Sequence, residues 1–242
     1  MRLAKHLAHA GVASRRGAEA IIAEGRVTVN GAIVTDPARD VSGAEKIEVD
    51  FEAVGRTDRK RVVYLLNKPP GVVSTAKDTH GRTTVVELVA HATRLYPVGR
   101  LDADARGLIL LTDDGDLAHL MTHPSFEVPK TYRVKVARGP ITDTALRRLR
   151  AGVKLDDGPT APAKVRRLGP TELELTIHEG RNRQVKRMCE AVGHRVVELR
   201  RVSFGSLELG TLREGAARRL KAAEVDQLRR LAEGGRSRGT PR

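Results

Sequence analysis

One aspartate stands out for its position in the sequence. Asp102 lies in the run 99–112, in a polar loop directly before the apolar segment 108–111, which predicts a short buried strand. Because a strand is rigid, it can hold a carboxylate at the lip of a cleft, where the carboxylate can act on a substrate. Taken alone, the run is also typical of turn aspartates among solvated arginines, since acidic loops are common. Its position makes Asp102 a candidate catalytic residue.

A second chemistry that this run could support is metal binding. Asp102, Asp104, Gly107 and Asp113 fall near the first, third, sixth and twelfth positions of a calcium loop. The fifth position is Arg106, a cation where an oxygen ligand is required, and Asp113 is shorter than the bidentate glutamate expected at the twelfth. The pattern therefore argues against calcium. It leaves a metal-dependent nuclease that uses the three aspartates as a weaker alternative.

Basic side chains concentrate between residues 181 and 201, where seven lysines or arginines accompany two glutamates. This density suits contacts to phosphate and makes Arg181, Arg183 and Arg187 candidate RNA-binding residues. An exposed helix face would give the same pattern. The segment also predicts a helix that ends at Gly193, because four apolar residues recur at helical spacing: Val185, Met188, Cys189 and Val192.

The composition is typical of a globular protein with a polyanionic partner. The chain has 242 residues, 40% of them hydrophobic, and a formal net charge of +14. This charge favours nucleic acid, although a solvated basic surface would also produce it. A membrane-surface protein is disfavoured, because there is no long apolar run and no helix combining a basic face with bulky aromatic anchors. With 2% aromatic residues, base stacking on an aromatic platform cannot be the main binding mode.

The first residues indicate an intracellular protein, and the cysteine count bears on disulfides and metal sites. The first residues join positive charge to an alanine-rich stretch, as a signal peptide would, but Lys5, His6 and His9 interrupt any apolar core. Cys189 is the single cysteine, so no internal disulfide can form. A structural zinc site is disfavoured for the same reason, and we expect no metal.

Residues 1–48 are expected to form a compact unit of two helices followed by short strands. Ser14 is the expected N-cap of the second helix, and Gly25 ends that helix. The dipeptide Asn30-Gly31 follows an alternating segment and predicts a hairpin turn.

From residue 61 to 232 the pattern favours an α+β domain. Residues 62–66 predict a strand that breaks at Lys68-Pro69-Pro70-Gly71, because proline cannot continue a sheet ladder. The alternating segments 132–136 and 172–177 predict half-buried strands of a mixed, largely antiparallel sheet. No regular strand-helix-strand repeat occurs, which argues against a doubly wound nucleotide-binding fold. The remaining segments are an expected linker over 49–60 and an expected disordered basic tail over 233–242.

Four short motifs follow one another along the second part of the chain: Asn67-Lys68-Pro69-Pro70-Gly71, Gly99-Arg100-Leu101-Asp102, Lys130-Thr131-Tyr132 and Gly180-Arg181-Asn182-Arg183-Gln184-Val185-Lys186-Arg187-Met188. In this order they resemble the RsuA/RluB family of ribosomal RNA pseudouridine synthases. Near the start, the segments 2–3, 10–16 and 25–31 are similar to the S-four-type RNA-binding domain that these enzymes carry. Several motifs in family order are far more specific than one, and the matches run over nearly the whole chain except the tail. The resemblance implies a small N-terminal αL domain of S-four type and a catalytic domain of pseudouridine synthase type.

This resemblance assigns roles in the expected cleft. Asp102 matches the family's catalytic carboxylate, a nucleophile that acts as the carbon–nitrogen glycosidic bond of uridine breaks, before the uracil turns and rejoins through carbon. Tyr132 matches the active-site tyrosine and Lys186 a basic partner that is arginine in some relatives, so Asp102 is expected between them. Arg100 is expected to hold phosphate or keep the nucleotide flipped out, and Leu199 to pack under the base. An ordinary core tyrosine and core leucine remain open alternatives.

The resemblance also implies the partners. No cofactor is expected, because nothing is oxidised or consumed overall. We expect a monomeric cytoplasmic enzyme that acts on ribosomal RNA or an assembly intermediate, with the large subunit favoured. The open alternative is a non-catalytic RNA-binding or ribosome-assembly factor that keeps the fold and would be indifferent to Asp102→Asn. The N-terminal cations expected to dock on RNA phosphates are Arg2, Lys5, Arg15, Arg16 and Arg26.

Overall fold

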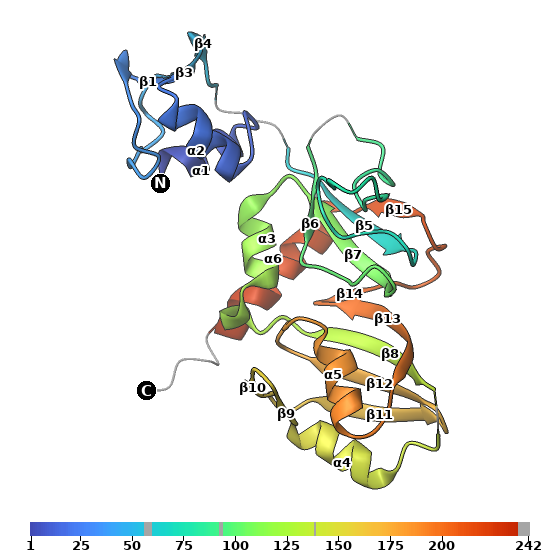
Figure 1. Ribbon diagram of the computed structural model, residues 1–242. Helices are drawn as coiled ribbons and strands as arrows, with labels where there is room; N and C mark the ends of the chain where they lie inside the picture. Colours follow the sequence, from blue (N-terminus) through green and yellow to red (C-terminus); the bar gives the residue numbers. More distant parts are fainter. Residues whose placement is uncertain (56–59, 92–93, 138, 237–242) are drawn as a thin grey trace. The chain divides into compact units, whose positions relative to one another are not determined.

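The computed structural model describes residues 1–55, 60–91, 94–137 and 139–236. The chain divides into two compact units, Met1–Arg61 and Val62–Arg242 (Figure 1). Each unit has a hydrophobic core of its own. Within the described ranges no helix is long and apolar enough to cross a membrane.

The first unit contains two helices and a four-stranded antiparallel sheet of order β2-β1-β3-β4. Ser14 caps α2 because its hydroxyl oxygen accepts the amide hydrogen of Gly17 at 2.9 Å. Gly25 follows the helix with a φ of 72°, and Asn30 and Gly31 both have positive φ, as a type I′ hairpin turn requires. These predictions are confirmed. The elements are α1 (Leu3–His9), α2 (Arg15–Ala23), β1 (Val27–Val29), β2 (Ala32–Ile33), β3 (Ile47–Val49) and β4 (Glu52–Ala53).

The first unit extends further than the sequence predicts. Its last strand, β4, pairs with β3 within the segment expected to be a linker. The physical reason is a tight turn at Asp50 and Phe51, whose positive φ angles of 50° and 69° return the chain antiparallel to β3. The start of the expected linker therefore belongs to the fold, and its residues 56–59 lie outside the described residues.

The second unit is built on one nine-stranded sheet, in which the main order is β11-β12-β8-β13-β7-β5-β15. Among the described strands only β7 and β13 pair in parallel, so the predicted α+β class with a largely antiparallel sheet is confirmed. The strands are β5 (Val63–Lys68), β6 (Tyr96–Val98), β7 (Arg106–Thr112), β8 (Lys130–Val136), β11 (Lys164–Gly169), β12 (Glu172–Ile177), β13 (Val196–Phe204), β14 (Leu207–Glu208) and β15 (Ala217–Arg219). A separate hairpin consists of β9 (Lys154–Leu155) and β10 (Gly158–Pro159).

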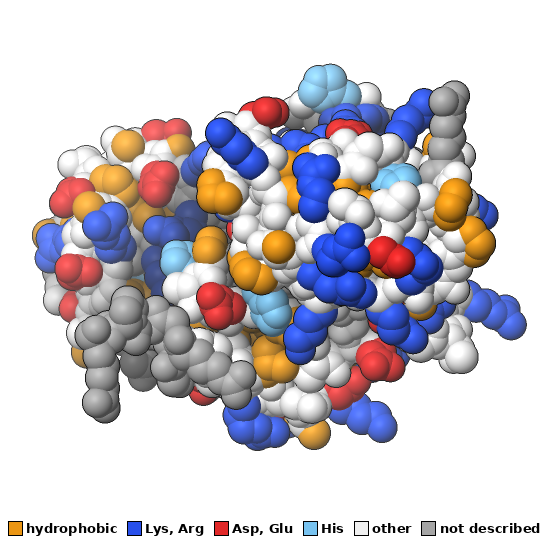
Figure 2. Space-filling model, turned by 90° about the horizontal axis from the view of Figure 1, so that it is seen from below, with side chains coloured by type: hydrophobic (Ala, Val, Ile, Leu, Met, Phe, Trp, Pro, Cys, Tyr) orange, Lys and Arg blue, Asp and Glu red, His pale blue; other side chains and the backbone are white. Residues whose placement is uncertain are grey.

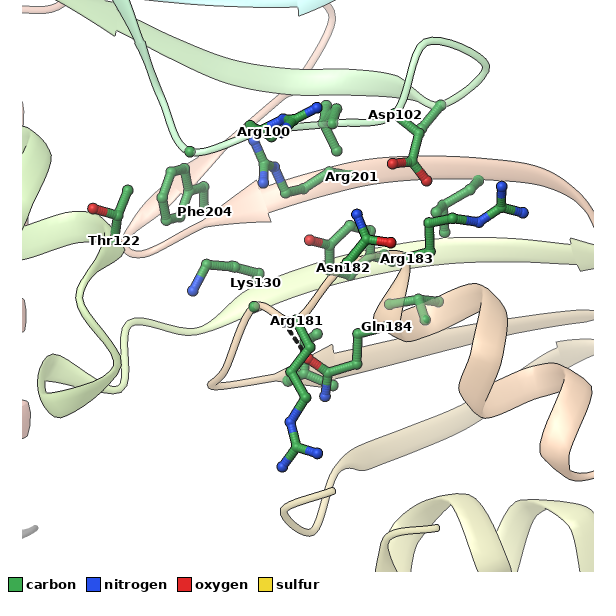
Figure 3. Close-up of a pocket in the computed structure, with 18 residues that line it drawn as sticks. Arg100, Asp102, Thr122, Lys130, Arg181, Asn182, Arg183, Gln184, Arg201 and Phe204 are labelled. Carbon is green, nitrogen blue, oxygen red and sulfur yellow. Dashed lines mark hydrogen bonds between the residues drawn. The ribbon is translucent and has the colours of Figure 1, made fainter. Parts of the chain in front are cut away.

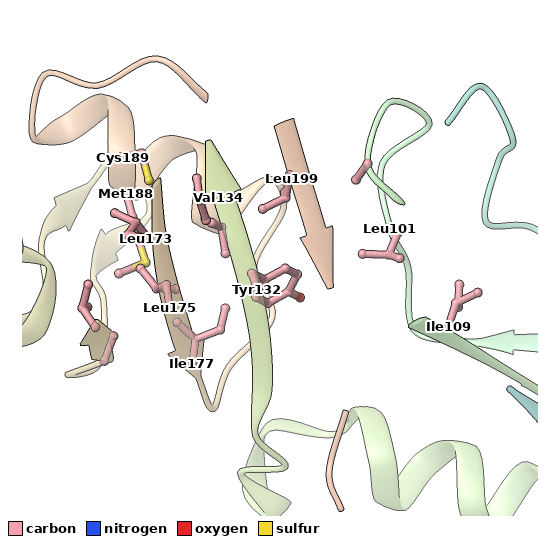
Figure 4. Packing of buried hydrophobic residues seen from close by; sticks show 14 of the residues in the cluster. Leu101, Ile109, Tyr132, Val134, Leu173, Leu175, Ile177, Met188, Cys189 and Leu199 are labelled. Atoms are coloured by element: carbon pink, nitrogen blue, oxygen red, sulfur yellow. The ribbon is translucent and has the colours of Figure 1, made fainter. Parts of the chain in front are cut away.

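Both faces of this sheet are covered. Leu108 and Leu110 of β7 lie in a core with α3 and α6, whereas Ile109 and Leu111 lie in a second core with α4, α5 and Tyr132 (Figure 4). A strand buried on both faces has a continuous apolar sequence, which explains the run 108–111. The helices are α3 (Gly115–Thr122), the short 3₁₀-helix η1 (Pro124–Phe126), α4 (Asp143–Ala151), α5 (Gln184–Ala191) and α6 (Ala222–Arg236).

The C-terminal helix extends into the segment expected to be a disordered tail. α6 continues to Arg236 through two glycines. A side chain at the second of these, Gly235, would overlap the carbonyl oxygen of Phe126, so the glycine permits close packing of α6 on η1. The first residues of the expected tail are therefore helical, and residues 237–242 lie outside the described residues.

Gly107 is required where the two parallel strands meet. It lies opposite Arg201 in the pairing of β7 with β13 and has a φ of 107°. A Cβ atom at this position would overlap the carbonyl oxygen of Arg201. Both the backbone conformation and the close approach of the two strands therefore depend on glycine.

We expect Gly107→Ala to lower the free energy of unfolding by at least about 2 kcal/mol, because the methyl group overpacks the strand contact and the backbone is strained. Urea denaturation followed by circular dichroism measures this change. Gly234→Ala in α6 is the control, since a Cβ there meets nothing within 4 Å, and it should be neutral or slightly stabilising. Unchanged stability of Gly107→Ala would contradict the role assigned to this glycine.

Candidate active site

The backbone of the loop that carries Asp102 is held in place by hydrogen bonds. This loop, residues 99–105, connects β6 to β7. The hydroxyl of Ser74 accepts the amide hydrogen of Leu101 at 3.1 Å and donates to its carbonyl oxygen at 2.8 Å. The amide of Ala105 donates to the carbonyl oxygen of Asp102 at 3.1 Å and closes a turn. The position of the Asp102 side chain is thus set by a fixed backbone.

Lys68 also holds this loop in place through hydrogen bonds. Its side chain is fully buried at the end of β5, and its ammonium donates to the carbonyl oxygens of Pro69, Ala103 and Ala105 at 2.9, 3.1 and 2.7 Å. Burial lowers the pKa of Lys68 to about 8, with nearby carboxylates acting in the opposite direction. Three hydrogen bonds to carbonyl oxygens satisfy all three donors of the ammonium, which therefore serves to position the loop.

Lys186 supplies the cation beside Asp102. It lies in the first turn of α5, and only 7% of its side chain is exposed. The ammonium lies 3.4 Å from Oδ2 of Asp102, and it donates to the two carboxylate oxygens of Asp104 at 2.6 and 2.7 Å. The hydrogen bond from Lys186 is the main reason why the pKa of Asp104 lies below its ordinary value of 3.8. The buried ammonium is thus shared between two aspartates, with Asp104 the closer one.

Asp102 opens onto a cavity of about 380 Å³, within the range of roughly 300–1,000 Å³ typical of small-molecule sites (Figure 3). Of the described residues that line it, Asp102 is the only carboxylate, whereas five are lysines or arginines. The cavity therefore presents one anionic group within a strongly cationic wall. The cations are Arg100, Lys130, Arg181, Arg183 and Arg201.

Apolar side chains of two neighbouring strands form part of the cavity wall. Tyr132 of β8 is 7% exposed and Leu199 of β13 is also 7% exposed, and both line the cavity. Each also belongs to the core cluster shown in Figure 4. Tyr132 and Leu199 are therefore core residues that also line the cavity, and their expected roles at a base stay predictions.

Most of the predicted site residues of the second unit lie together, but Arg187 does not. Arg100, Arg181 and Arg183 line the cavity with Asp102, whereas Arg187 is absent from the described lining and pairs with Asp157 at 2.9 Å. The hydrogen bond to Asp157 raises the pKa of Arg187. Arg187 thus joins α5 to the β9–β10 hairpin.

Arg181 also has local partners. Its Nε donates to Glu179 at 3.1 Å, and Nη2 donates to the carbonyl oxygen of Pro159 at 2.6 Å. These bonds leave Arg181 on the cavity wall but engage part of its hydrogen-bonding capacity. Arg100 and Arg183 are therefore the better placed of the predicted arginines for contacts to a ligand.

The predicted RNA-binding cations of the first unit differ in their exposure and in their hydrogen bonds to carboxylates. Arg15 and Arg16 are exposed at the start of α2, and Arg2 is exposed just before α1. Arg26, by contrast, donates to Asp50 at 2.9 Å and to Glu24 at 3.1 Å. The hydrogen bonds from Arg26, first to Asp50, raise its pKa. The remaining predicted cation, Lys5, is partly buried in α1.

Several residues of the site were not identified from the sequence. Asp104 was considered only as a metal ligand, and Lys130, Arg201 and Phe204 were given no role of their own. The burial of Lys68 was not predicted either, because lysine is rarely buried. The others depend on contacts between distant segments, for which the sequence has no local sign.

The three aspartates considered for metal binding are not gathered in one place. Asp104 contacts Lys186, and Asp113 accepts the amide hydrogen of Val62 at 2.8 Å. Within the part of the chain that the structure describes, no three histidine, cysteine or acidic side chains lie close enough together to hold a metal ion. The geometry gives no support to the nuclease alternative.

Comparison with known proteins identifies the family. Residues 62–191, more than half of the chain, match the family described as RNA pseudouridylate synthase. The chain belongs to this family. Residues 1–47 match the S4 domain, so the predicted family and its N-terminal RNA-binding domain are both confirmed.

Individual relatives agree with this assignment. The chain is 47% identical to ribosomal large subunit pseudouridine synthase B of Bacillus subtilis (strain 168), with 98% of each protein covered. It is 40% identical to the protein of the same name from Xanthomonas campestris, where the match covers 96% of this chain and 50% of the other. A crystal structure of a pseudouridylate synthase has a TM-score of 0.70 and 34% identity, covering 94% of this chain and 99% of that one.

Asp104→Asn tests the pairing with Lys186. Because the ammonium lowers the pKa of Asp104 below 3.8, the ionised carboxylate stabilises the fold above that pH, and the contribution is lost as pH falls through the lowered pKa. We expect the variant to be less stable than the unchanged protein near neutral pH and equally stable at strongly acidic pH. Urea denaturation over a pH series measures the difference. Asp226→Asn, at an exposed position of α6, is the control, and a pH-independent difference for Asp104→Asn would contradict the pairing.

Proposed function

We propose that this chain isomerises a specific uridine of ribosomal RNA to pseudouridine, with Asp102 as the catalytic nucleophile and without a cofactor. Tyr132 and Leu199 provide the apolar surface on which the base rests, and Lys186 supplies the cation beside the carboxylate. The observation that carries the proposal is the placement of Asp102 as the single carboxylate among the described residues that line the cavity, 3.4 Å from a buried ammonium.

The charge arrangement suits a carboxylate nucleophile. Such a group must stay ionised while RNA covers the cavity and removes water, and the loss of hydration is costly for an isolated anion. The ammonium of Lys186 offsets that cost for Asp102. Asp104 makes the shorter contacts to Lys186 but is not among the described residues that line the cavity, whereas the carboxylate of Asp102 lines it and is 34% exposed.

The reaction needs no external reagent. The bond between C1′ and N1 of uridine breaks, the uracil turns within the cavity, and a bond forms between C1′ and C5. The hydrogen on C5 leaves and N1 gains one, so substrate and product have the same atoms and the same oxidation state. Residues that bind, orient and stabilise charge are therefore sufficient, which supports a mechanism that uses side chains alone.

The substrate class is supported by charge and by the relatives. Lysine and arginine side chains are spread over the face of the molecule shown in Figure 2, as expected for a protein with a net charge of +14 that binds a polyanion. The names of the Bacillus and Xanthomonas relatives refer to the large ribosomal subunit. We therefore favour large-subunit RNA, free or in an assembly intermediate, as the substrate of a monomeric cytoplasmic enzyme.

Asp102→Asn should abolish turnover without abolishing RNA binding. We expect pseudouridine formation on large-subunit RNA to fall by at least about 10³-fold, because the amide is not a nucleophile. The fold should persist, since Asp104 still compensates the charge of Lys186. Mapping of pseudouridines by chemical modification and primer extension measures the product, and filter binding measures affinity.

The matched control for this substitution is Asp226→Asn, which removes a carboxylate from the exposed surface of α6 and should leave turnover unchanged. Turnover by Asp102→Asn equal to that of the unchanged chain would contradict the catalytic role. RNA binding without any pseudouridine formation by the unchanged chain would favour a non-catalytic RNA-binding or ribosome-assembly factor.

The exposed arginines of the first unit provide a test of RNA docking. We expect the double substitution Arg15→Gln and Arg16→Gln to weaken RNA binding and to reduce the slope of log affinity against log salt by about 0.7–0.9 for each phosphate that is no longer neutralised. Arg26→Gln should have a smaller effect, because the guanidinium of Arg26 is already engaged by Asp50. Titrations over a salt series measure both slopes. An equal or larger effect of Arg26→Gln would refute this ranking.

A further inference from the structure

Two cations flank one aromatic ring at the end of the cavity away from Asp102 (Figure 3). The ammonium of Lys130 lies 5.5 Å from the centroid of the Phe204 ring, and the guanidinium carbon of Arg201 lies 4.8 Å from it. Neighbouring strands supply these residues, since Lys130 is opposite Phe204 and Arg201 is opposite Tyr132 in the pairing of β8 with β13. All of them line the same cavity as Asp102.

Arg201 is buried but only partly hydrogen-bonded. It is 2% exposed, and its Nε donates to the carbonyl oxygen of Leu108 at 2.7 Å. Its Nη2 is buried and has no hydrogen-bond partner within the described ranges. A buried donor without a partner destabilises a folded protein, and a charged donor does so more strongly. The arginine therefore retains capacity to bind an acceptor.

Lys130 is in a similar situation. Its ammonium donates to the carbonyl oxygen of Val128 at 3.0 Å, which uses one of three donors. Burial, and to a lesser extent the positive charge of Arg201, lowers the pKa of Lys130 to about 8, so the ammonium still carries its charge at neutral pH. Among the described residues, neither Lys130 nor Arg201 forms an ion pair with a carboxylate.

The two ends of the cavity thus differ in charge compensation. At one end, Asp102 lies 3.4 Å from the ammonium of Lys186, which is not itself among the described residues that line the cavity. At the other end, two partly desolvated cations stand close together without an anion. A purely structural role for Arg201 would need only the bond to Leu108 and the contact with Phe204, and it would not explain a second cation at Lys130.

We propose that Lys130 and Arg201 form a phosphate subsite that binds a phosphodiester group of the RNA next to the target nucleotide. A phosphate oxygen satisfies the unused donors, and its charge compensates both cations, which a neutral carbonyl group of a base cannot do. The subsite rests on the proposed function, because it takes the target uridine to lie at Asp102. It fixes the direction in which the RNA strand passes through the cavity and so aligns the glycosidic bond with the carboxylate.

The test measures RNA affinity over a salt series in an Asp102→Asn background, with a transcript of large-subunit ribosomal RNA as the probe. We expect Lys130→Gln to weaken binding about tenfold at low salt and to reduce the salt slope by about 0.7, as the removal of one cation from a phosphate requires. Lys135→Gln is the matched control. It lies on the same strand but is exposed and pairs with Glu172, so its salt slope should equal that of the parent.

Folding is checked by thermal unfolding of each variant. Because the ammonium of Lys130 is partly desolvated, Lys130→Gln should unfold at the same temperature as the parent or higher, and Lys130→Met is a second charge-free variant for the same slope measurement. An unchanged slope and affinity in both folded variants would overturn the phosphate subsite. A changed slope together with no pseudouridine formation by the unchanged chain would instead overturn the catalytic proposal alone.

Discussion

The buried ammonium of Lys186 is the constraint on which the site depends. A lysine with 7% of its side chain exposed must be compensated by anions, because an isolated buried charge costs several kcal/mol. Asp104 and Asp102 provide that compensation from a loop 82 or more residues away in sequence. The charge therefore ties α5 to the loop 99–105. The two aspartates differ in position, since Asp104 makes the shorter contacts to Lys186 and Asp102 is the one that lines the cavity.

The sheet brings these distant segments together. Because β7 and β13 are parallel neighbours, they begin at the same end of the strand pair, and the segments that precede them therefore lie near each other. The loop 99–105 precedes β7, and α5 precedes β13. The parallel contact in turn depends on Gly107, which permits the close approach of the Arg201 backbone. A single position without a side chain thus supports the pairing that places carboxylate and ammonium side by side.

The sequence predicts features whose causes are local and misses those that depend on distant contacts. Ser14 as a cap and Asn30-Gly31 as a turn follow from the residues themselves, and the structure has both. The pairing of Gly107 with Arg201 has no local sign, and neither has the contact between Lys186 and Asp104. The density of the basic run 181–201 predicts phosphate contacts or an exposed helix face, and neither interpretation indicates that Arg201 is buried.

The roles expected for Asp102, Tyr132 and Lys186 came from a family resemblance and not from the spacing of the residues. Taken alone, Tyr132 has the alternation of a core strand and Asp102 has the setting of a turn aspartate. Such ambiguity is expected at a functional site, because a side chain that lines a cavity is also part of a packed core. In three dimensions the two residues, which lie 30 positions apart in the sequence, line one cavity.

On the proposed function, the uneven distribution of charge in that cavity follows from what an RNA-modifying site must do. The group that reacts has to be held still before substrate arrives, and the satisfied contacts of Lys186 and Lys68 provide that rigidity. The groups that bind the substrate, by contrast, must keep hydrogen-bond donors free, so these donors find a partner only when the ligand binds. Arg201 retains such a donor at a cost in stability of the free protein. An RNA phosphate bound at Arg201 offsets that cost by accepting a hydrogen bond from the free donor. The chemistry at Asp102 then proceeds in a site whose framework does not need to move.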